Sequence, residues 1–117
     1  MLCACLGCTR LDDRLQQHQE KLDSIAASTV AIGEAWLAGQ TSGTYTITAL
    51  EQMLQLVEKE RRELAGTPEA LIDARGARLS QTAEQLSRLL AATRHEVRGA
   101  NADAVRQHIA NVSARRS

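Results

Sequence analysis

The sequence predicts an all-α protein, an antiparallel up-down-up bundle of three long helices followed by a short C-terminal helix. Composition is the first reason: apolar residues make up 44% of the 117 residues, Phe is absent, and Pro68 is the only proline. Strands favour aromatic and β-branched residues, and sandwiches or barrels need many turns, so this composition favours helices. The second reason is the spacing of the apolar residues. It alternates between three and four over long stretches, as in helices that pack lengthwise against a partner.

The length of the chain predicts a single domain. We expect residues 10–114 to form the bundle, residues 1–9 to form a separate apolar segment, and residues 115–117 to be a basic tail. Lys plus Arg equals Asp plus Glu, 14 against 14, so the chain has no overall field that would steer it onto phosphates. Trp36 and Tyr45 are the only aromatics, which does not support base stacking. We therefore expect no nucleic-acid partner.

The first predicted helix runs from about Arg10 to Ala38, and the rest of the chain is organised around it. Its seam has unbroken heptad spacing and comprises Leu11, Leu15, His18, Leu22, Ile25, Thr29, Ile32 and Trp36. We interpret His18 as a partly buried histidine with one hydrogen bond, since a polar residue on a seam often fixes register. Gly39 fits the left-handed position that ends a helix. Trp36 and Tyr45 flank the turn that follows and are expected to close this end of the bundle.

A second predicted helix follows the loop at residues 39–44 and runs to about Ala65. Thr44 and Thr48 are its candidate N-caps, because hydroxyl side chains accept hydrogen bonds from the free N–H groups of a first turn. Its predicted seam comprises Ile47, Leu50, Leu54, Val57, Arg61 and Leu64. We expect Arg61 to extend from this seam to the edge of the bundle.

The third predicted helix spans about Pro68 to Arg98, after Gly66 has ended the second. Its seam comprises Ile72, Gly76, Leu79, Ala83, Leu86, Leu90, Thr93 and Val97. Because the phase of the seam survives through Gly76, we expect one continuous helix with a weak point, where Gly costs about 1 kcal/mol relative to Ala. The alternative is a break at Arg75–Gly76 between two shorter helices.

A last helix is predicted from about Ala102 to Ala114, capped by Asn101, with Val105, Ile109 and Val112 on one side. The first and third helices are longer than the second, so the last helix or a second copy of the chain is expected to cover their ends. The residues expected at the core or at an interface are Leu15, His18, Leu22, Ile25, Ile32, Trp36, Leu54, Leu86 and Leu90. Of these, Leu15, Leu22, Ile25, Leu54, Leu86 and Leu90 are expected at the centre.

The first eight residues are apolar and small and hold all three cysteines of the chain. Cys5-Leu6-Gly7-Cys8 resembles the lipobox that ends a bacterial lipoprotein signal peptide, in which a large apolar residue, a small residue and Gly or Ala precede an acylated Cys. Gly7 and Cys8 match this pattern, whereas the large apolar residue stands one position later than in the family. The basic region and most of the apolar region of a signal are missing, so we expect translation to start upstream of Met1.

This resemblance implies a lipid attached to Cys8 and an address in the bacterial cell envelope. Thr9 is not an acidic retention signal, so the resemblance points to the outer membrane. Two alternatives remain open: the cysteine cluster arises by chance, or Cys3, Cys5 and Cys8 hold a soft metal as thiolates. No apolar run approaches the roughly twenty residues that span a bilayer.

Motifs that carry chemistry are absent from the sequence. It contains no Glu-x-x-His, no His-Glu-x-x-His, no Cys-x-x-Cys-His, no Gly-x-Ser-x-Gly elbow and no glycine-rich phosphate loop. We therefore expect no catalytic residue, no bound metal, no cofactor and no enzymatic activity.

The function favoured by the sequence is that of a small, non-catalytic helical envelope lipoprotein with a structural or adaptor role, which binds protein partners or its own copies. One alternative is a soluble cytoplasmic subunit or adaptor that pairs through its heptad seams. Another is a bundle that binds a metal or a small ligand.

Overall fold

Five α-helices and no strand occur in the part of the chain that the computed structural model describes, namely the backbone of residues 2–116 and the side chains of residues 10–114. The helices are α1 (Leu2–Leu37), α2 (Gly43–Ala65), α3 (Pro68–Ile72), α4 (Ala74–Arg98) and α5 (Ala102–Arg116). The all-α prediction is confirmed. The expected three long helices and one short helix become five, because the third expected helix is interrupted.

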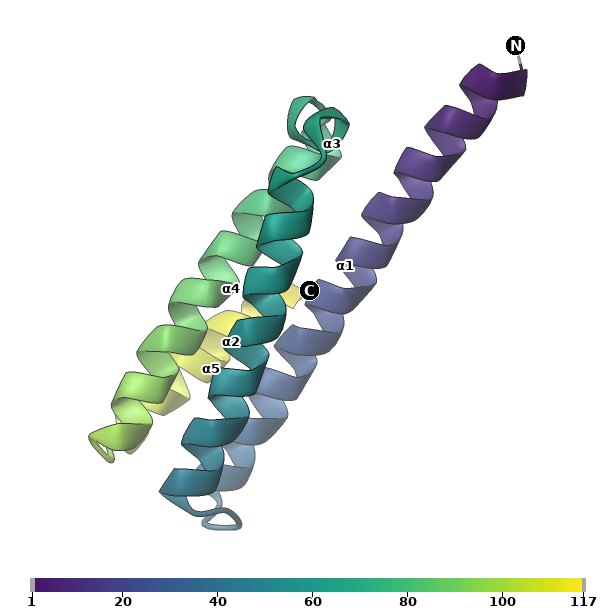
Figure 1. Ribbon diagram of the computed structural model, residues 1–117. Helices are drawn as coiled ribbons and strands as arrows, with labels where there is room; N and C mark the ends of the chain where they lie inside the picture. The colour runs from purple at the N-terminus through teal and green to yellow at the C-terminus, as the bar shows by residue number, and fades with distance from the viewer. Residues whose placement is uncertain (1, 117) are drawn as a thin grey trace.

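The helices pack lengthwise into an elongated bundle of 58 × 24 × 19 Å. In Figure 1, α2 and α4 lie side by side, α1 forms one edge, and α5 lies behind them. The most extensive contact is between α2 and α4, and α5 lies against both α1 and α4. The short turn after α2 therefore returns the chain along its neighbour, as expected from its length.

Helix ends follow the local sequence signals in most places. Gly39 has a φ of +74°, and its left-handed conformation ends α1 as predicted. The prediction that Thr44 or Thr48 caps α2 was wrong, because α2 begins at Gly43, before either threonine. Ser42 is the cap, and its hydroxyl accepts a hydrogen bond from the Tyr45 amide at 3.1 Å. Asn101 caps α5 as predicted, since its side-chain oxygen accepts from the Ala104 amide at 3.2 Å.

The prediction of one continuous third helix was wrong. Two helices form, as in the alternative, but the break lies at Asp73 rather than at Arg75–Gly76. Asp73 has φ −85° and ψ 135°, which ends α3. Its carboxylate accepts hydrogen bonds from the amides of Arg75 at 2.8 Å and Gly76 at 3.4 Å, which starts α4. An Asx-type cap of this kind offers the backbone an alternative to continuing the helix. The interruption takes Ile72 off the expected seam, and this residue is 89% exposed.

Gly76 is required where α4 passes α3. It is buried, and a Cβ atom at this position would lie 1.9 Å from the carbonyl oxygen of Ala70. The glycine is thus a close-approach site between two backbones.

The core is made by the seams of all the long helices. Its central side chains, each almost fully buried, are Leu15, Leu22, Ile25, Leu50, Val57, Leu64, Leu79, Leu86, Leu90, Val97, Val105, Ile109 and Val112. Leu54, expected at the centre, is half-buried and packs against this core, as do Ile32 and Trp36. Tyr45 is exposed, so only Trp36 of the two aromatics packs onto this core.

The buried seam of α2 is shifted relative to the predicted one. Leu50, Val57 and Leu64 are shared by the predicted and the observed seam. The other buried residues of α2 are Thr46 and Glu60, rather than the predicted Ile47 and Arg61. Arg61, predicted on the seam, is half-buried and pairs with Glu58 at 2.9 Å. A carboxylate rather than an arginine therefore enters the bundle.

The N-terminal predictions concern side chains outside the described ones. The backbone of α1 begins at Leu2 rather than near Arg10. The side chains of the lipobox-like segment, including that of Cys8, lie outside the described ones, as do those of the predicted basic tail at residues 115–117, although the backbone of α5 continues to Arg116. Within the described part of the chain, every helix is too short or too polar to cross a membrane.

Candidate functional site

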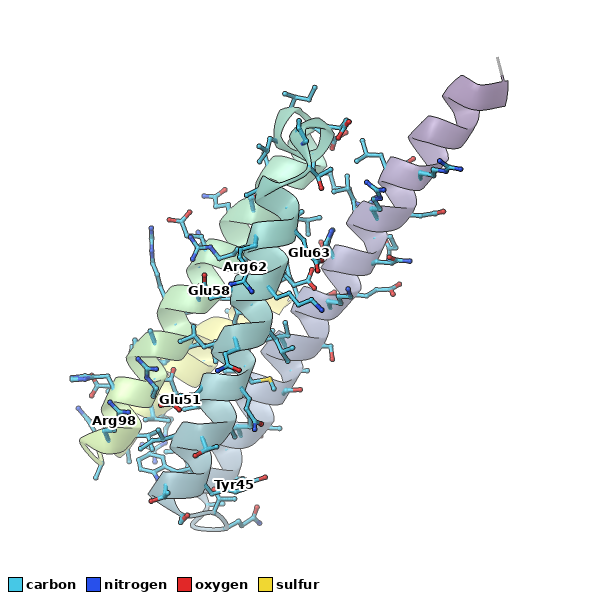
Figure 2. The ribbon with its side chains drawn as sticks, viewed as in Figure 1. Tyr45, Glu51, Glu58, Arg62, Glu63 and Arg98 are labelled. Atoms are coloured by element: carbon cyan, nitrogen blue, oxygen red, sulfur yellow. The ribbon has the colours of Figure 1, made fainter. Side chains whose placement is uncertain are left out.

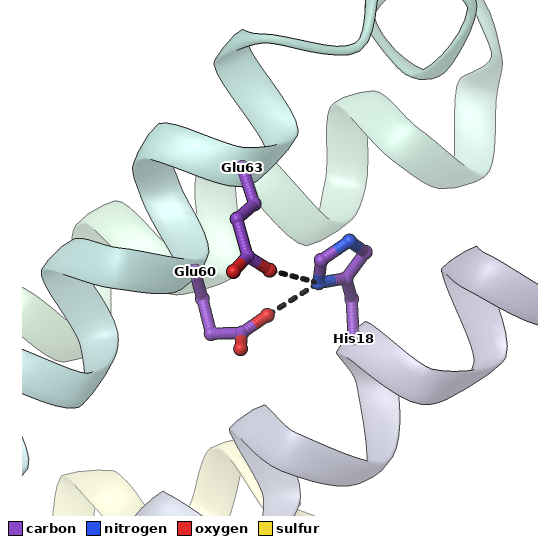
Figure 3. A group of neighbouring side chains, drawn as sticks. All are labelled: His18, Glu60 and Glu63. Carbon is purple, nitrogen blue, oxygen red and sulfur yellow. Dashed lines mark hydrogen bonds and ion pairs between the residues drawn. The ribbon is translucent and has the colours of Figure 1, made fainter.

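A cluster of one histidine and two glutamates lies between α1 and α2. His18 comes from the seam of α1, and Glu60 and Glu63 come from α2. Residues three apart project from the same side of a helix, so both glutamates face α1. Figure 3 shows the two carboxylates turned toward one ring nitrogen of His18.

The contacts within the cluster are close and mostly shielded from water. His18 Nδ1 contacts Glu60 Oε2 directly, and Glu63 Oε2 lies 4.0 Å from the same nitrogen. The side chain of Glu60 is only 4% exposed and that of His18 is 12% exposed, whereas Glu63 is 41% exposed. Lys21 lies at the rim, with Nζ 3.5 Å from Glu60 Oε1. Glu60 therefore sits at the inner end of the cluster and Glu63 at its solvent side.

The buried position of Glu60 needs a physical explanation, because removing a carboxylate from water costs several kcal/mol unless partners replace the water. His18 and Lys21 on α1 supply these partners. A helix seam normally holds an apolar residue at such a position, so the packing of the core does not account for the carboxylate.

The heptad spacing places His18 on the seam of α1, but it does not indicate Glu60 and Glu63. The signal for Glu60 was present in the second phase of α2, in which Thr46, Leu50, Met53, Val57, Glu60 and Leu64 also alternate by four and three. Apolar content alone favoured the predicted seam, which has Ile47 and Arg61 in place of Thr46 and Glu60. That seam begins with an apolar residue, whereas the observed seam begins with a threonine.

A second polar group joins α2 to α4. The hydroxyl of Ser87 donates to Glu58 Oε1 at 2.7 Å, and Arg61 donates to the same carboxylate at 2.9 Å. These hydrogen bonds, that of Ser87 first, lower the pKa of Glu58. An open hollow of about 360 Å³ lies beside them and is lined by Glu58, Arg61, Arg62, Ala65, Leu71, Ser80 and Glu84. Figure 2 shows Glu58 and Arg62 on this side of the bundle.

A third group lies nearer the other end of the same two helices. Glu51 on α2 accepts a hydrogen bond from Arg98 at 3.4 Å and lies 3.8 Å from Arg94, both on α4. Figure 2 shows Glu51 and Arg98 facing each other across the outer surface. Exposed pairs of this kind contribute only about 0–1 kcal/mol each, so they set register more than stability.

Comparison with protein-family models, with curated proteins and with solved structures gives no match.

Proposed function

We propose that the chain is a non-catalytic helical adaptor of the bacterial cell envelope, held at the outer membrane by a lipid on Cys8. The anchor part rests on the resemblance of Cys5-Leu6-Gly7-Cys8 to a lipobox. The adaptor part rests on the surface of the bundle. The proposal takes α1, α2 and the interrupted pair α3–α4 as the three long members of an up-down-up bundle, with α5 as its short C-terminal helix.

The observation that carries the adaptor role is the exposure of two adjacent apolar side chains on α3. Ile72 is 89% exposed and Leu71 is 49% exposed. Single exposed apolar residues are common on protein surfaces, but an apolar pair on a short helix at one end of a bundle offers a contact point for a partner. Leu71 also lines the hollow beside Glu58 and Arg61, so apolar and charged groups adjoin there.

The described polar groups favour a structural role over catalysis. Glu51, Glu58 and Glu60 each contact a side chain of a neighbouring helix. Such contacts hold helices in register, and each of the three carboxylates is engaged by a side chain of another helix.

The heptad seams themselves are poor candidates for binding another chain. Leu22 of α1, Leu50 of α2 and Leu90 of α4 are buried by the chain's own helices. A soluble subunit that pairs through these seams would have to open the bundle first, so this alternative is less favoured.

The anchor is tested by membrane fractionation of bacteria that express the gene with its upstream region. Wild type and the control variant Cys3→Ser are expected in the outer-membrane fraction, whereas Cys8→Ser is expected to lose its membrane association. A Cys8→Ser protein that fractionates like wild type, or a wild type found wholly in the cytoplasm, would contradict the proposal.

The contact surface is tested by replacing Ile72 with a photo-reactive amino acid in the same cells. A cross-linked protein species is expected from position 72 and not from the exposed control position Gln81 on α4. No cross-link at position 72, or equal cross-linking at both positions, would argue against α3 as the binding surface.

A further inference from the structure

We propose that His18, Glu60 and Glu63 bind a divalent transition-metal ion, with Zn²⁺ as the best fit, and that this ion joins α1 to α2. The site goes beyond the adaptor function and does not depend on it. It also departs from the expectation of no metal, which rested on motifs within single stretches of sequence. Here the ligands come from two helices that are distant in the sequence.

The ligand types define the class of ion. One imidazole nitrogen and two carboxylate oxygens suit Zn²⁺, which accepts both donor types and commonly takes three protein ligands with water in a fourth position. Mg²⁺ and Ca²⁺ prefer sites made of oxygen alone. A histidine at the centre of the cluster therefore favours the transition metal.

The distances are close to those of a bound site. One ligand atom from each of the three residues lies within 4.8 Å of the other two. In a tetrahedral zinc site with bonds of about 2.1 Å, ligand atoms are about 3.4 Å apart. Side-chain rotations of the two glutamates can close the difference, because long carboxylate side chains rotate while α1 and α2 stay in place.

The charges of the site also call for a cation. Two carboxylates converge on His18, and Lys21 is the cationic side chain that the structure pairs with Glu60. Lys21 lies on the solvent side and is half-exposed, so it can turn outward when an ion arrives. A divalent ion would then balance both carboxylates at once, including that of the buried Glu60.

The cluster is open to solvent on one side. A shallow groove of about 270 Å³ adjoins it and is lined by Lys21, Ser24, Ile25, Leu56, Lys59 and Glu60. The side chain of Glu63 is 41% exposed. An ion can enter from this exposed side of the cluster, and water can complete its coordination.

The test uses full-length protein in which Cys3, Cys5 and Cys8 are replaced by Ser, because thiolates also bind zinc. Isothermal titration with ZnCl₂ is expected to give one ion per chain, with MgCl₂ giving at least about tenfold weaker binding. Saturating Zn²⁺ is expected to raise Tm by several degrees, because an ion that binds only the folded chain stabilises it. Co²⁺ is expected to give visible absorption bands that depend on His18.

Glu63→Gln is the decisive variant, because Glu63 is partly exposed and its replacement leaves the buried pair intact. It is expected to weaken Zn²⁺ binding by at least about tenfold without changing the circular dichroism spectrum, and His18→Gln to abolish the Co²⁺ bands. Glu34→Gln, on the exposed side of α1, is the matched control and should bind like the parent. No stoichiometric binding by the cysteine-free parent, or equal binding by Glu63→Gln and Glu34→Gln, would overturn the proposal.

Discussion

Gly76→Ala tests the close approach of α3 and α4, because sequence and structure predict opposite changes in the free energy of unfolding. In a helix interior, Ala is more favourable than Gly by about 1 kcal/mol, so the isolated sequence predicts stabilisation. In the fold, the new Cβ would lie 1.9 Å from the carbonyl oxygen of Ala70 and 2.6 Å from its carbonyl carbon. These are backbone atoms, so no change of rotamer relieves the contact and α3 must move away from α4.

The magnitude follows from the two opposing effects. Overpacking costs about 1–3 kcal/mol, and the upper end applies because the obstruction is backbone. Subtracting the gain in helix propensity leaves a loss of about 2 kcal/mol in the free energy of unfolding. For a chain of this length we expect Tm to fall by about 6–12 °C.

Urea denaturation followed by circular dichroism measures this change, with Gly99→Ala as the matched control. Gly99 has a φ of −80°, and its Cβ would lie 3.8 Å from the carbonyl oxygens of His95 and Glu96, an ordinary van der Waals contact, so this variant should be neutral or slightly more stable. A Gly76→Ala protein as stable as wild type, or more stable, would refute the packing of α3 on α4.

Three further predictions concern the core, a helix cap and a titrating group. Leu90→Ala should lower the free energy of unfolding in urea by about 2–5 kcal/mol, whereas the exposed Leu56→Ala should change it by less than about 0.5 kcal/mol; equal losses would contradict the assigned core. Asp73→Ala should cost about 1 kcal/mol in the same assay, since two amides of α4 lose their acceptor, and an unchanged midpoint would count against this cap. Ser87→Ala should raise the pKa of Glu58 in an NMR titration. Because the pKa of Glu58 is lowered in the folded state, the ionised carboxylate stabilises the fold above pH 4.5. This stabilisation is lost as the pH falls through the pKa that Glu58 has in the folded protein. Ser87→Ala should therefore lose less stability on acidification than wild type. An identical Glu58 titration in both proteins would show that the Ser87 hydrogen bond is not the cause.

The helical positions and the seam of α4 could be predicted from the sequence. From Gly76 onward the predicted seam positions of this helix are all buried, and they comprise Gly76, Leu79, Ala83, Leu86, Leu90, Thr93 and Val97. Periodicity is sufficient here because α4 lies at the centre of the fold, against α2, α3, α5 and α1, so one apolar face sets its orientation.

The break at Asp73 could not be predicted from periodicity, because the apolar phase continues through it. Two features decide where the helix breaks, one a local hydrogen bond and the other a contact between two helices. Asp73 caps the new helix with its own side chain, and Gly76 lets α4 pass the backbone of Ala70. A heptad pattern records neither effect, and Ile72 was therefore assigned to a core that it does not reach.

The candidate site was missed for a different reason. The two possible seams of α2 share Leu50, Val57 and Leu64, so the choice between Glu60 and Arg61 depends on what α1 places opposite them. His18 and Lys21 supply that partner surface, and their pairing with α2 is a long-range contact that a single sequence does not specify.

The intact mass of the protein recovered from its native cells tests the proposed anchored adaptor most directly. The account predicts a chain that begins at Cys8 and carries the added mass of a lipid. An unmodified chain that retains Met1 would contradict it, removing the anchor and the envelope address together.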